Sequence, residues 1–449
     1  MDLLAPLIKN IIAPLWWLRD GDMRFSYLKN LEKSQWLTLV ELQTQQLTKL
    51  KKLLIHAHNT VPYYTEIFKL AGFDPNTISS LGDLARLPIL SKSAIIDHKD
   101  RLISSDFNKQ DMTPACTGGS TGTQLHFYID EESNRMKNAC AWRHNRWAGW
   151  DIGTRVAAVW GNPKQPSTLK TKLRAALLAR YAYLDTMRMT NDSMSAFAHK
   201  LKHWMPCVLY GHAHSIYLLA EFLKDAKLRV PTPRGIVVTS MMLIPQERQV
   251  IEQVLGCKVT NRYGCEEVSL IASECAEHNG MHLNLDHLVV EFIKEDGLAA
   301  RPGEDGRIVV TDLTNFGMPF IRYAVGDVGV PSARICPCGR GLPLMERLSG
   351  RMADFLIRMD GSKVAGVSLV ERLLTNILGI RQMQIVQNEK QRLCFRIVKN
   401  SDFSAELSEQ NLQTEFADIF PGSAMYIEYV FAIPQEQNGK YRFAICNVQ

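Results

Sequence analysis

Helices and strands alternate along the middle of the sequence, and this order constrains the fold more than any other feature. Short apolar runs typical of buried strands occur at residues 155–160, 235–239, 257–261, 288–293 and 307–312. Apolar residues at helical spacing precede or separate the first three of these runs, at residues 131–150, 194–204, 215–226 and 246–255. Such alternation is typical of a parallel sheet flanked by helices, so the sequence predicts an α/β fold.

The chain has 449 residues, which is too long for one ordinary domain. Beyond residue 351 the pattern changes to that of a small α+β unit, with expected elements at 369–377, 382–387, 392–398, 406–419 and 425–430. We therefore expect a large N-terminal domain, residues 1–350, with mixed or parallel sheets and flanking helices. A small α+β C-terminal domain, residues 351–449, follows it.

Composition narrows the setting and the partners. The net charge of +6 suits anionic ligands, and no run rich in lysine and arginine indicates a nucleic-acid surface. Ten cysteines without a signal peptide indicate a cytoplasmic protein whose thiols pack in the core or bind metal.

The N-terminal stretch, residues 3–18, is largely apolar but is interrupted by Lys9 and ends near Trp16 and Trp17. It is too short to span a bilayer. Two alternatives stay open: an interfacial helix peripheral to the inner face of the membrane, or a helix docked on the protein's own core.

A glycine- and hydroxyl-rich stretch precedes an apolar alternation at residues 125–129. Glycines let main-chain N–H groups approach a ligand closely, and the hydroxyl groups add donors, so the stretch suits a phosphate. It lacks the Gly-Lys-Ser/Thr ending of a Walker A loop. An ordinary surface turn is the alternative. The stretch consists of Thr117, Gly118, Gly119, Ser120, Thr121 and Gly122.

Two further stretches carry polar groups beside glycine. Tyr263, Gly264 and Glu267 follow the strand predicted at 257–261, where ligands of open α/β sheets bind. Tyr263 can stack on a purine and Glu267 can hold Mg²⁺. The alternative is a strand-to-helix turn whose acids lie near a helix N-terminus. Asp327 can accept hydrogen bonds from a ribose diol, and a Gly-Asp hairpin turn is its alternative.

A structural zinc site is predicted separately. Cys336 and Cys338 lie on a turn, and Cys275 and His282 upstream complete four ligands of the type zinc prefers. His278 is the alternative nitrogen ligand. Two free thiols in a Pro/Gly turn are the structural alternative.

Taken in order, these stretches resemble the adenylate-forming ligase superfamily. The boundary segment with Arg351 and the Gly-Lys pair ending at Lys440 complete the series. The similarity is closest to the phenylacetate-CoA ligase-like branch, and there to the capsular-polysaccharide CapK-like proteins. That branch is indicated by Trp36 followed by Pro62-Tyr63-Tyr64, by the segment 87–92, and by Cys336-Pro337-Cys338-Gly339-Arg340.

The resemblance implies a role for each stretch. Residues 117–122 would enclose the ATP phosphates, Tyr263 with Gly264 would face adenine, and Glu267 would hold Mg²⁺. Asp327 and Arg351 would bind the ribose. The C-terminal domain would be mobile and would carry Lys440 to the substrate carboxylate and the α-phosphate. Lys440 and Glu267 are therefore the expected catalytic residues.

The resemblance also implies the reaction. A carboxylic acid is activated by ATP as an acyl- or aryl-adenylate with release of pyrophosphate, and the acyl group passes to an acceptor, CoA by default. Alternatives are amide or ester transfer to an amine or hydroxyl of a sugar intermediate in surface polysaccharide biosynthesis, and a non-catalytic nucleotide-binding scaffold. Met241-Met242 and Glu266 depart from the family pattern, so the acid is not named by the sequence.

Overall fold

The structure is a computed structural model. It describes residues 2, 4–19, 23–117, 125–161, 168–169, 172, 180–240, 243, 245–348, 355–399, 403–431, 433 and 444–448.

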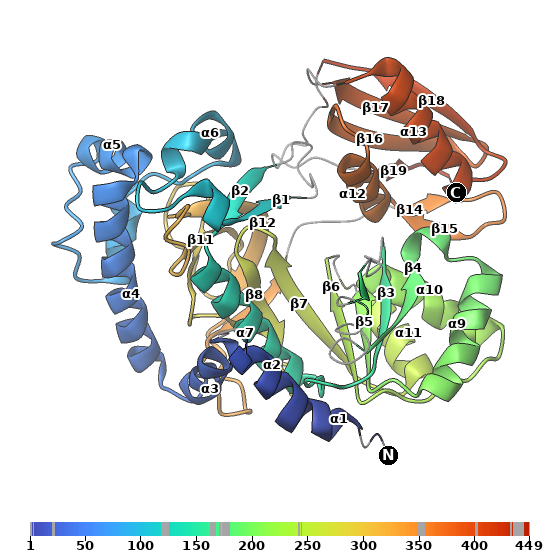
Figure 1. The fold of residues 1–449 in the computed structure, drawn as a ribbon, viewed down its shortest axis with the longest axis horizontal. Coiled ribbons are helices and arrows are strands. Elements are labelled where there is room, and N and C mark those ends of the chain that lie inside the picture. The colour runs from blue at the N-terminus through green and yellow to red at the C-terminus, as the bar shows by residue number, and fades with distance from the viewer. Residues whose placement is uncertain are drawn as a thin grey trace.

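The helices of the larger unit surround a central sheet (Figure 1). They are α1 Leu4–Leu7, the π-helix η1 Ile8–Ile12, α2 Ala13–Arg19, α3 Arg24–Ser34, α4 Leu39–Thr60, α5 Pro62–Leu70, α6 Lys92–Asp97, α7 Glu131–Trp147, α9 Asn191–Trp204, α10 Ala213–Asp225 and α11 Pro245–Leu255. Short 3₁₀ segments are η2 Leu81–Arg86, η3 Lys99–Leu102, η4 Lys109–Asp111 and η5 Thr186–Arg188.

The strands of this unit confirm the α/β class. They are β1 Thr113–Cys116, β2 His126–Ile129, β3 Val156–Trp160, β4 Tyr181–Asp185, β5 Val208–His212, β6 Gly235–Thr239, β7 Val259–Cys265, β8 Ser269–Glu274, β9 Met281–Leu283, β10 Leu288–Ile293, β11 Gly306–Asp312, β12 Tyr323–Pro331 and β13 Leu344–Leu348. Strands β1 and β2 form an antiparallel pair of their own.

The remaining strands form one mixed sheet, with eleven strands in the described part of the chain. Their order is β10-β11-β12-β13-β9-β8-β7-β6-β5-β3-β4. Strands β3 to β7 run parallel, whereas β7 pairs antiparallel with β8 and the pairing stays antiparallel out to β10. Strand β7 therefore joins a parallel half of the sheet to an antiparallel half.

A close backbone approach shapes the end of β7. The ladder shifts register between Tyr263 and Gly264, and a Cβ atom on Gly264 would lie 2.4 Å from the carbonyl oxygen of Ser269. Only glycine allows this approach. The turn after β7 thus leads into β8 as a hairpin, which excludes the predicted strand-to-helix alternative for this stretch.

Helix α7 is fixed at its start by Asp130. The Oδ1 atom of this N-cap residue accepts from the Ser133 N–H at 2.7 Å, and Oδ2 accepts from the N–H groups of Phe316 and Gly317 at 2.7 and 3.0 Å. One carboxylate thus caps the N-terminus of α7 and connects it to the loop after β11.

The helix predicted at 131–150 is confirmed, as are the strands at 155–160, 235–239, 288–293 and 307–312, within a few residues. The prediction missed β4, β5, β8, β9, β12 and β13, most of which are short. Asp327 lies inside β12 and not in a hairpin turn, because this strand extends from Tyr323 to Pro331.

A smaller unit follows, described from Phe355 onward (Figure 1). Its sheet has the order β18-β17-β16-β19 and has its own apolar core with the two helices. Its elements are β14 Phe355–Ile357, β15 Lys363–Ala365, α12 Gly366–Asn376, β16 Ile380–Glu389, β17 Arg392–Lys399, α13 Ala405–Ile419, β18 Ala424–Tyr429 and β19 Ala444–Cys446. The predicted boundary at residues 350–351 lies outside the described residues.

Polar contacts link the two units. Arg188 forms an ion pair with Asp418 at 2.6 Å, and Arg372 lies 3.8 Å from Asp185. The Arg188–Asp418 pair is exposed, and exposed ion pairs contribute little stability, so this pair is compatible with movement of one unit on the other.

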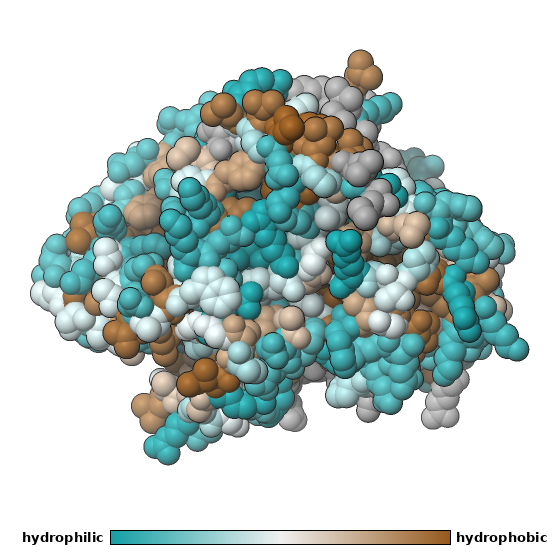
Figure 2. All heavy atoms as spheres, turned by 90° about the horizontal axis from the view of Figure 1, so that it is seen from below, coloured by the Kyte–Doolittle hydropathy of each residue, from teal (hydrophilic) through white to brown (hydrophobic). Residues whose placement is uncertain are grey.

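The N-terminal helices dock on the larger unit and also expose an apolar stripe. Ile8, Ala13 and Trp17 are buried against Ile152, so the docked-helix alternative describes this face and Trp17 points inward. The opposite face exposes Leu4, Leu7, Ile11, Leu15 and Leu18. Hydrophobic side chains gather along the upper edge of the face seen in Figure 2. In the described part of the chain, no helix combines the length and hydropathy needed to cross a bilayer. Membrane contact stays a prediction.

The crossing of α7 and β6 gives a stability prediction. A Cβ atom on Gly235 would lie 1.8 Å from the carbonyl oxygen of Ala148, whereas one on Gly82 meets nothing closer than 3.6 Å. Gly235→Ala should lower the free energy of unfolding by about 3 kcal/mol, because backbone must move. Gly82→Ala should change it by less than about 0.5 kcal/mol. Equal midpoints for both variants in chemical denaturation would contradict the description of this crossing.

Candidate active site

Glu267 is held in place at the tip of the β7–β8 hairpin. The Tyr323 hydroxyl, from the first residue of β12, donates to Glu267 Oε1 at 2.7 Å. Both side chains are buried. The hydrogen bond fixes the direction in which this carboxylate points.

A second tyrosine–carboxylate pair lies beside the first. The Tyr263 hydroxyl donates to Asp327 Oδ2 at 3.0 Å, and each residue is only 6% exposed. In sheet order, β8, β9 and β13 separate β7 from β12. The antiparallel half must therefore curve so that residues predicted to bind one nucleotide come together.

Lys137 of helix α7 supports the β7–β8 hairpin. The sequence patterns did not indicate a role for this residue. Its Nζ atom donates to the Glu267 carbonyl oxygen at 3.1 Å and pairs with Asp312 Oδ2 at 2.8 Å. Both partners of the pair are buried. Burial alone would raise the pKa of Asp312, but the Lys137 charge outweighs it and holds that pKa below its usual value. Lysine in the middle of an otherwise polar helix gave no sequence signal of this contact.

Thr117 closes the base of the predicted phosphate loop. Its N–H donates to the Leu125 carbonyl, and its Oγ1 accepts from the Leu125 N–H, each at 3.0 Å. Lys92 Nζ lies 3.5 Å from the same Oγ1. The two ends of the loop are thus pinned together. Seven of the predicted site residues lie outside the described residues. They are Gly118, Gly119, Ser120, Thr121, Gly122, Arg351 and Lys440.

An aromatic-lined face adjoins this edge of the sheet and was not predicted. The ring of Trp160, at the end of β3, stacks on Tyr210 at 5.2 Å and lies 4.2 Å from the His212 ring, both on β5. Burial lowers the pKa of His212 to about 4, so its imidazole is neutral at pH 7. Arg262 of β7 lies on the same face, since His212 pairs with Thr239 and Val238 pairs with Asn261. The Tyr-Gly-His sequence at 210–212 is the signal that could have indicated it.

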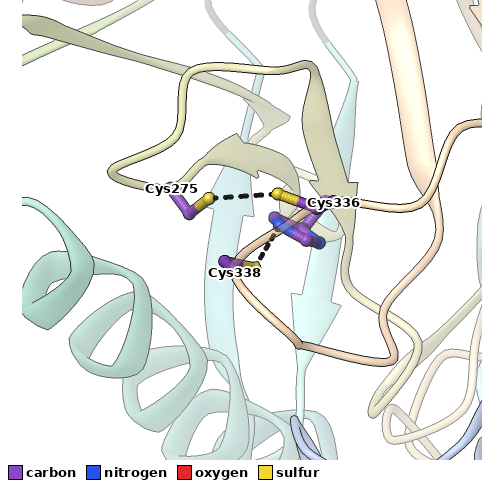
Figure 3. A group of neighbouring side chains, drawn as sticks. Cys275, Cys336 and Cys338 are labelled. Carbon is purple, nitrogen blue, oxygen red and sulfur yellow. Dashed lines mark hydrogen bonds between the residues drawn. The ribbon is translucent and has the colours of Figure 1, made fainter.

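The predicted zinc ligands come together. The ligand atoms of Cys275, His282, Cys336 and Cys338 all lie within 4.8 Å of one another (Figure 3). The two sulfur atoms of Cys275 and Cys336 are 3.6 Å apart, and His282 Nε2 lies 3.4 Å from Cys338 Sγ. In a tetrahedral site with Zn–S bonds of about 2.3 Å, two sulfur ligands lie about 3.7 Å apart. A disulfide needs about 2.05 Å, so the geometry fits a metal and not a disulfide.

The orientation of His282 also suits a metal. Its Nδ1 atom lies 2.9 Å from the Leu342 carbonyl oxygen, which fixes the proton on Nδ1 and leaves the Nε2 lone pair toward Cys338. Burial lowers the His282 pKa, which favours the neutral, ligating form. His278 instead faces Glu274 at 3.4 Å, so His282 is the histidine of this cluster.

Comparisons with known proteins show what this chain is similar to. Residues 356–447 match the family model of the CapK C-terminal domain. The phenylacetate-coenzyme A ligase of Thermus thermophilus is 25% identical over 326 residues, which cover 71% of this chain and 72% of that protein. The corresponding ligase of Escherichia coli is 27% identical over 331 residues, with the same coverage.

Solved structures show the same fold over almost the whole chain. The crystal structure of 2-hydroxyisobutyryl-CoA ligase with 2-HIB-AMP and CoA, in the thioesterification state, has a TM-score of 0.63 at 20% identity. It covers 93% of this chain and 92% of that chain. The chain thus has the fold of the adenylate-forming ligases. The similarity to phenylacetate-coenzyme A ligases supports the class of AMP-forming ligases, which the sequence resemblance predicted.

The support of the β7–β8 hairpin gives a pH prediction. His287 is fully buried, its Nε2–H donates to the Val268 carbonyl oxygen at 3.1 Å, and burial lowers its pKa to about 4. Its unfolded pKa is about 6.5, so the unfolded chain gains a proton first as the pH falls. Stability is therefore lost between about pH 6.5 and pH 4.

Between pH 7 and pH 5 the wild-type free energy of unfolding should fall about 2 kcal/mol further than that of His287→Gln. Glutamine retains a donor for Val268. The exposed His199 provides the control, since His199→Gln should follow the wild type. Parallel pH profiles for wild type and His287→Gln in urea titrations would show that His287 is not buried as the neutral form.

Proposed function

We propose that the protein activates a carboxylic acid with ATP and transfers the acyl group to CoA. In the first half-reaction a carboxylate oxygen attacks the α-phosphorus and pyrophosphate leaves, which gives an acyl-adenylate. In the second, the thiol attacks the acyl carbon and AMP leaves. The 2-hydroxyisobutyryl-CoA ligase complex with acyl-AMP and CoA supports this order for a protein of the same fold.

The observation that carries the proposal is the pair of tyrosine–carboxylate hydrogen bonds, Tyr323 to Glu267 and Tyr263 to Asp327. Through these bonds two carboxylates, those of Glu267 and Asp327, lie oriented beside each other near the end of β7. A carboxylate suits the Mg²⁺ that accompanies ATP, and Glu267 would hold that ion, which neutralises phosphate charge. Asp327 would accept hydrogen bonds from the ribose diol, with Arg351 beside it, and Tyr263 with Gly264 would border the adenine.

The Asp327 assignment predicts a selective loss of nucleotide binding. Asp327→Ala removes charge-assisted hydrogen bonds worth about 1.5–3 kcal/mol each, so AMP and ATP should bind at least about 100-fold more weakly. Tyr263→Phe keeps the ring and the carboxylate and should lose less. Titration calorimetry on the folded variants measures both. Unchanged affinity in Asp327→Ala would exclude its role.

The two predicted domains divide the work in this proposal. Residues 1–350 would bind ATP and the acid, with the 117–122 loop around the phosphates. Residues 351–449 would carry Lys440 to the reacting groups for adenylation and withdraw it for transfer. The match of residues 356–447 to the CapK C-terminal domain supports a separate unit. Rotation about a few boundary residues is a known switching mode.

Lys440 tests this division directly. Because carboxylate and α-phosphate are both anionic, loss of a cation between them raises the barrier to attack. Lys440→Ala should slow adenylate formation by about three orders of magnitude. Transfer from a supplied acyl-adenylate should be affected far less. Normal adenylation, or equal loss of both half-reactions in a folded variant, would exclude the role; Lys399→Ala, in the same unit, provides the control.

We also propose that Cys275, His282, Cys336 and Cys338 hold a structural zinc ion. The turn that bears Cys336 and Cys338 continues into Arg340, which lies between the rings of Trp36 and Trp147 at 4.9 and 4.5 Å. The metal would thus stiffen the contact of this turn with Trp36 and Trp147. It takes no part in the chemistry.

Purified protein should contain about one zinc ion per chain. Cys338→Ser should lower both zinc content and melting temperature, because binding free energy of the metal becomes folding free energy. Cys257→Ser, outside the cluster, is the matched control. Elemental analysis that finds no metal after reducing, chelator-free purification would contradict the site.

A second acceptor class has one observation in its favour. The CapK C-terminal match covers the unit that would face the acceptor, so an amine or hydroxyl of a sugar intermediate is the competing acceptor, with surface polysaccharide biosynthesis as the setting. Trapping the acyl group with CoA, hydroxylamine or an amino sugar separates the two. Faster transfer to the amino sugar than to CoA would replace the thiol in this proposal.

A further inference from the structure

Arg262 lies at the carboxyl ends of the parallel strands. His212 of β5 is paired with Thr239 of β6, and Val238 is paired with Asn261 of β7. Residue 262 therefore stands level with Thr239 and His212. Paired residues in a parallel sheet share a face, so these three side chains belong to the aromatic-lined face that also bears Tyr210. In open α/β sheets, ligands bind at this end of the strands.

The charge of Arg262 has no counter-ion among the described residues. The side chain is 8% exposed, donates one hydrogen bond to Asn145 Oδ1, and lies 5.9 Å from the centre of the Trp150 ring. Its Nε atom is buried without an acceptor. A buried cation normally has an anionic partner, because desolvation of an isolated charge is costly.

Two other buried arginines, Arg143 and Arg322, follow that rule. Arg143 pairs with Asp286, and Arg322 makes two bonds of 2.9 and 3.1 Å to the Glu291 carboxylate. Arg262 departs from the pattern within the same protein. Its nearest hydroxyl groups do not compensate, since burial raises the pKa of both Tyr210 and Tyr181 and keeps them uncharged.

The surroundings indicate what kind of molecule would bring the missing charge. The rings of Trp150, Tyr210 and Trp160 follow one another at 5.0 and 5.2 Å. They form an apolar, aromatic wall beside the guanidinium. Arg262 directly precedes Tyr263, and successive side chains of a strand point to opposite faces. A molecule that reaches both Arg262 and the nucleotide residues must therefore lie across the carboxyl end of β7. An apolar framework along the rings with an anionic group at its far end fits both features.

We propose that Arg262 binds a second carboxylate on the acid substrate, so that the protein activates dicarboxylic acids in preference to monocarboxylic acids of the same framework. The inference rests on the proposed function. One carboxylate reacts with ATP, and the other forms a bidentate pair with the guanidinium. A site built around a buried polar group discriminates strongly against analogues that leave the group unpaired.

The test is ATP–pyrophosphate exchange with matched acids, benzoate against terephthalate and hexanoate against adipate. In the wild type, kcat/KM for the dicarboxylate should exceed that for the monocarboxylate. In Arg262→Met this ratio should fall by about 100-fold, mainly through KM of the dicarboxylate. Arg262→Lys should restore part of the ratio. Arg334→Met, at an exposed arginine, should leave it unchanged.

Thermal shift gives an independent measurement. Terephthalate should raise the melting temperature of the wild type more than benzoate does, and should not raise that of Arg262→Met. Without ligand, Arg262→Met should melt no lower than the wild type, since it removes an unpaired buried charge. A lower melting temperature would assign Arg262 a structural role through Asn145 and would overturn the inference.

These experiments distinguish failure of the Arg262 site from failure of the proposed ligase function. If monocarboxylates support exchange but neither wild type nor variant distinguishes dicarboxylates, the second-carboxylate site is wrong and the ligase function stands. An equal loss with both acid classes in Arg262→Met would place the reacting carboxylate at Arg262 and would also overturn the inference. If no acid supports exchange but terephthalate still stabilises only proteins with Arg262, the binding site stands and the ligase function fails.

Discussion

Strand β7 is the constraint on which the rest of the structure depends. It pairs parallel with β6 on one side and antiparallel with β8 on the other, so the two halves of the sheet meet along it. Its last residues include Arg262, Tyr263 and Gly264, and the hairpin that follows bears Glu267. Because Gly264 lets the Ser269 carbonyl approach, the chain turns back directly after β7. The polar side chains of its last residues therefore lie at the carboxyl end of the strand. Nucleotide, metal and acid are proposed to meet there.

The site is oriented by neutral donors and one buried ion pair. Tyr323 and Tyr263 each direct a carboxylate, and Lys137 ties the hairpin to Asp312. Each tyrosine hydroxyl donates one hydrogen bond, and a carboxylate can accept several. The carboxylates therefore remain able to attract Mg²⁺ and to accept from ribose hydroxyls. The zinc-type cluster lies beyond β8 and supports the sheet at a distance from this chemistry.

The sequence predicted the α/β class and the four thiol and imidazole ligands, because periodicity and ligand types are local signals. It could not show that Tyr263 contacts Asp327, since that contact depends on curvature across β8, β9 and β13. Lys137 gave no signal because its partners lie more than a hundred residues away. Arg262 was missed because only the packed structure shows that its charge is buried without a carboxylate. The sequence likewise could not show that His282, and not His278, lies among the three cysteines.

The central claim is that a carboxylate oxygen bonds to the α-phosphorus of ATP. It is tested most directly by incubating the protein with ATP, CoA and a substrate acid labelled with ¹⁸O in its carboxyl group. Adenylation followed by transfer leaves one labelled oxygen in AMP, because the acyl–oxygen bond breaks in the second step. Mass spectrometry should find the label in AMP and none in pyrophosphate. Label in inorganic phosphate with formation of ADP would show an acyl phosphate instead and would contradict the account.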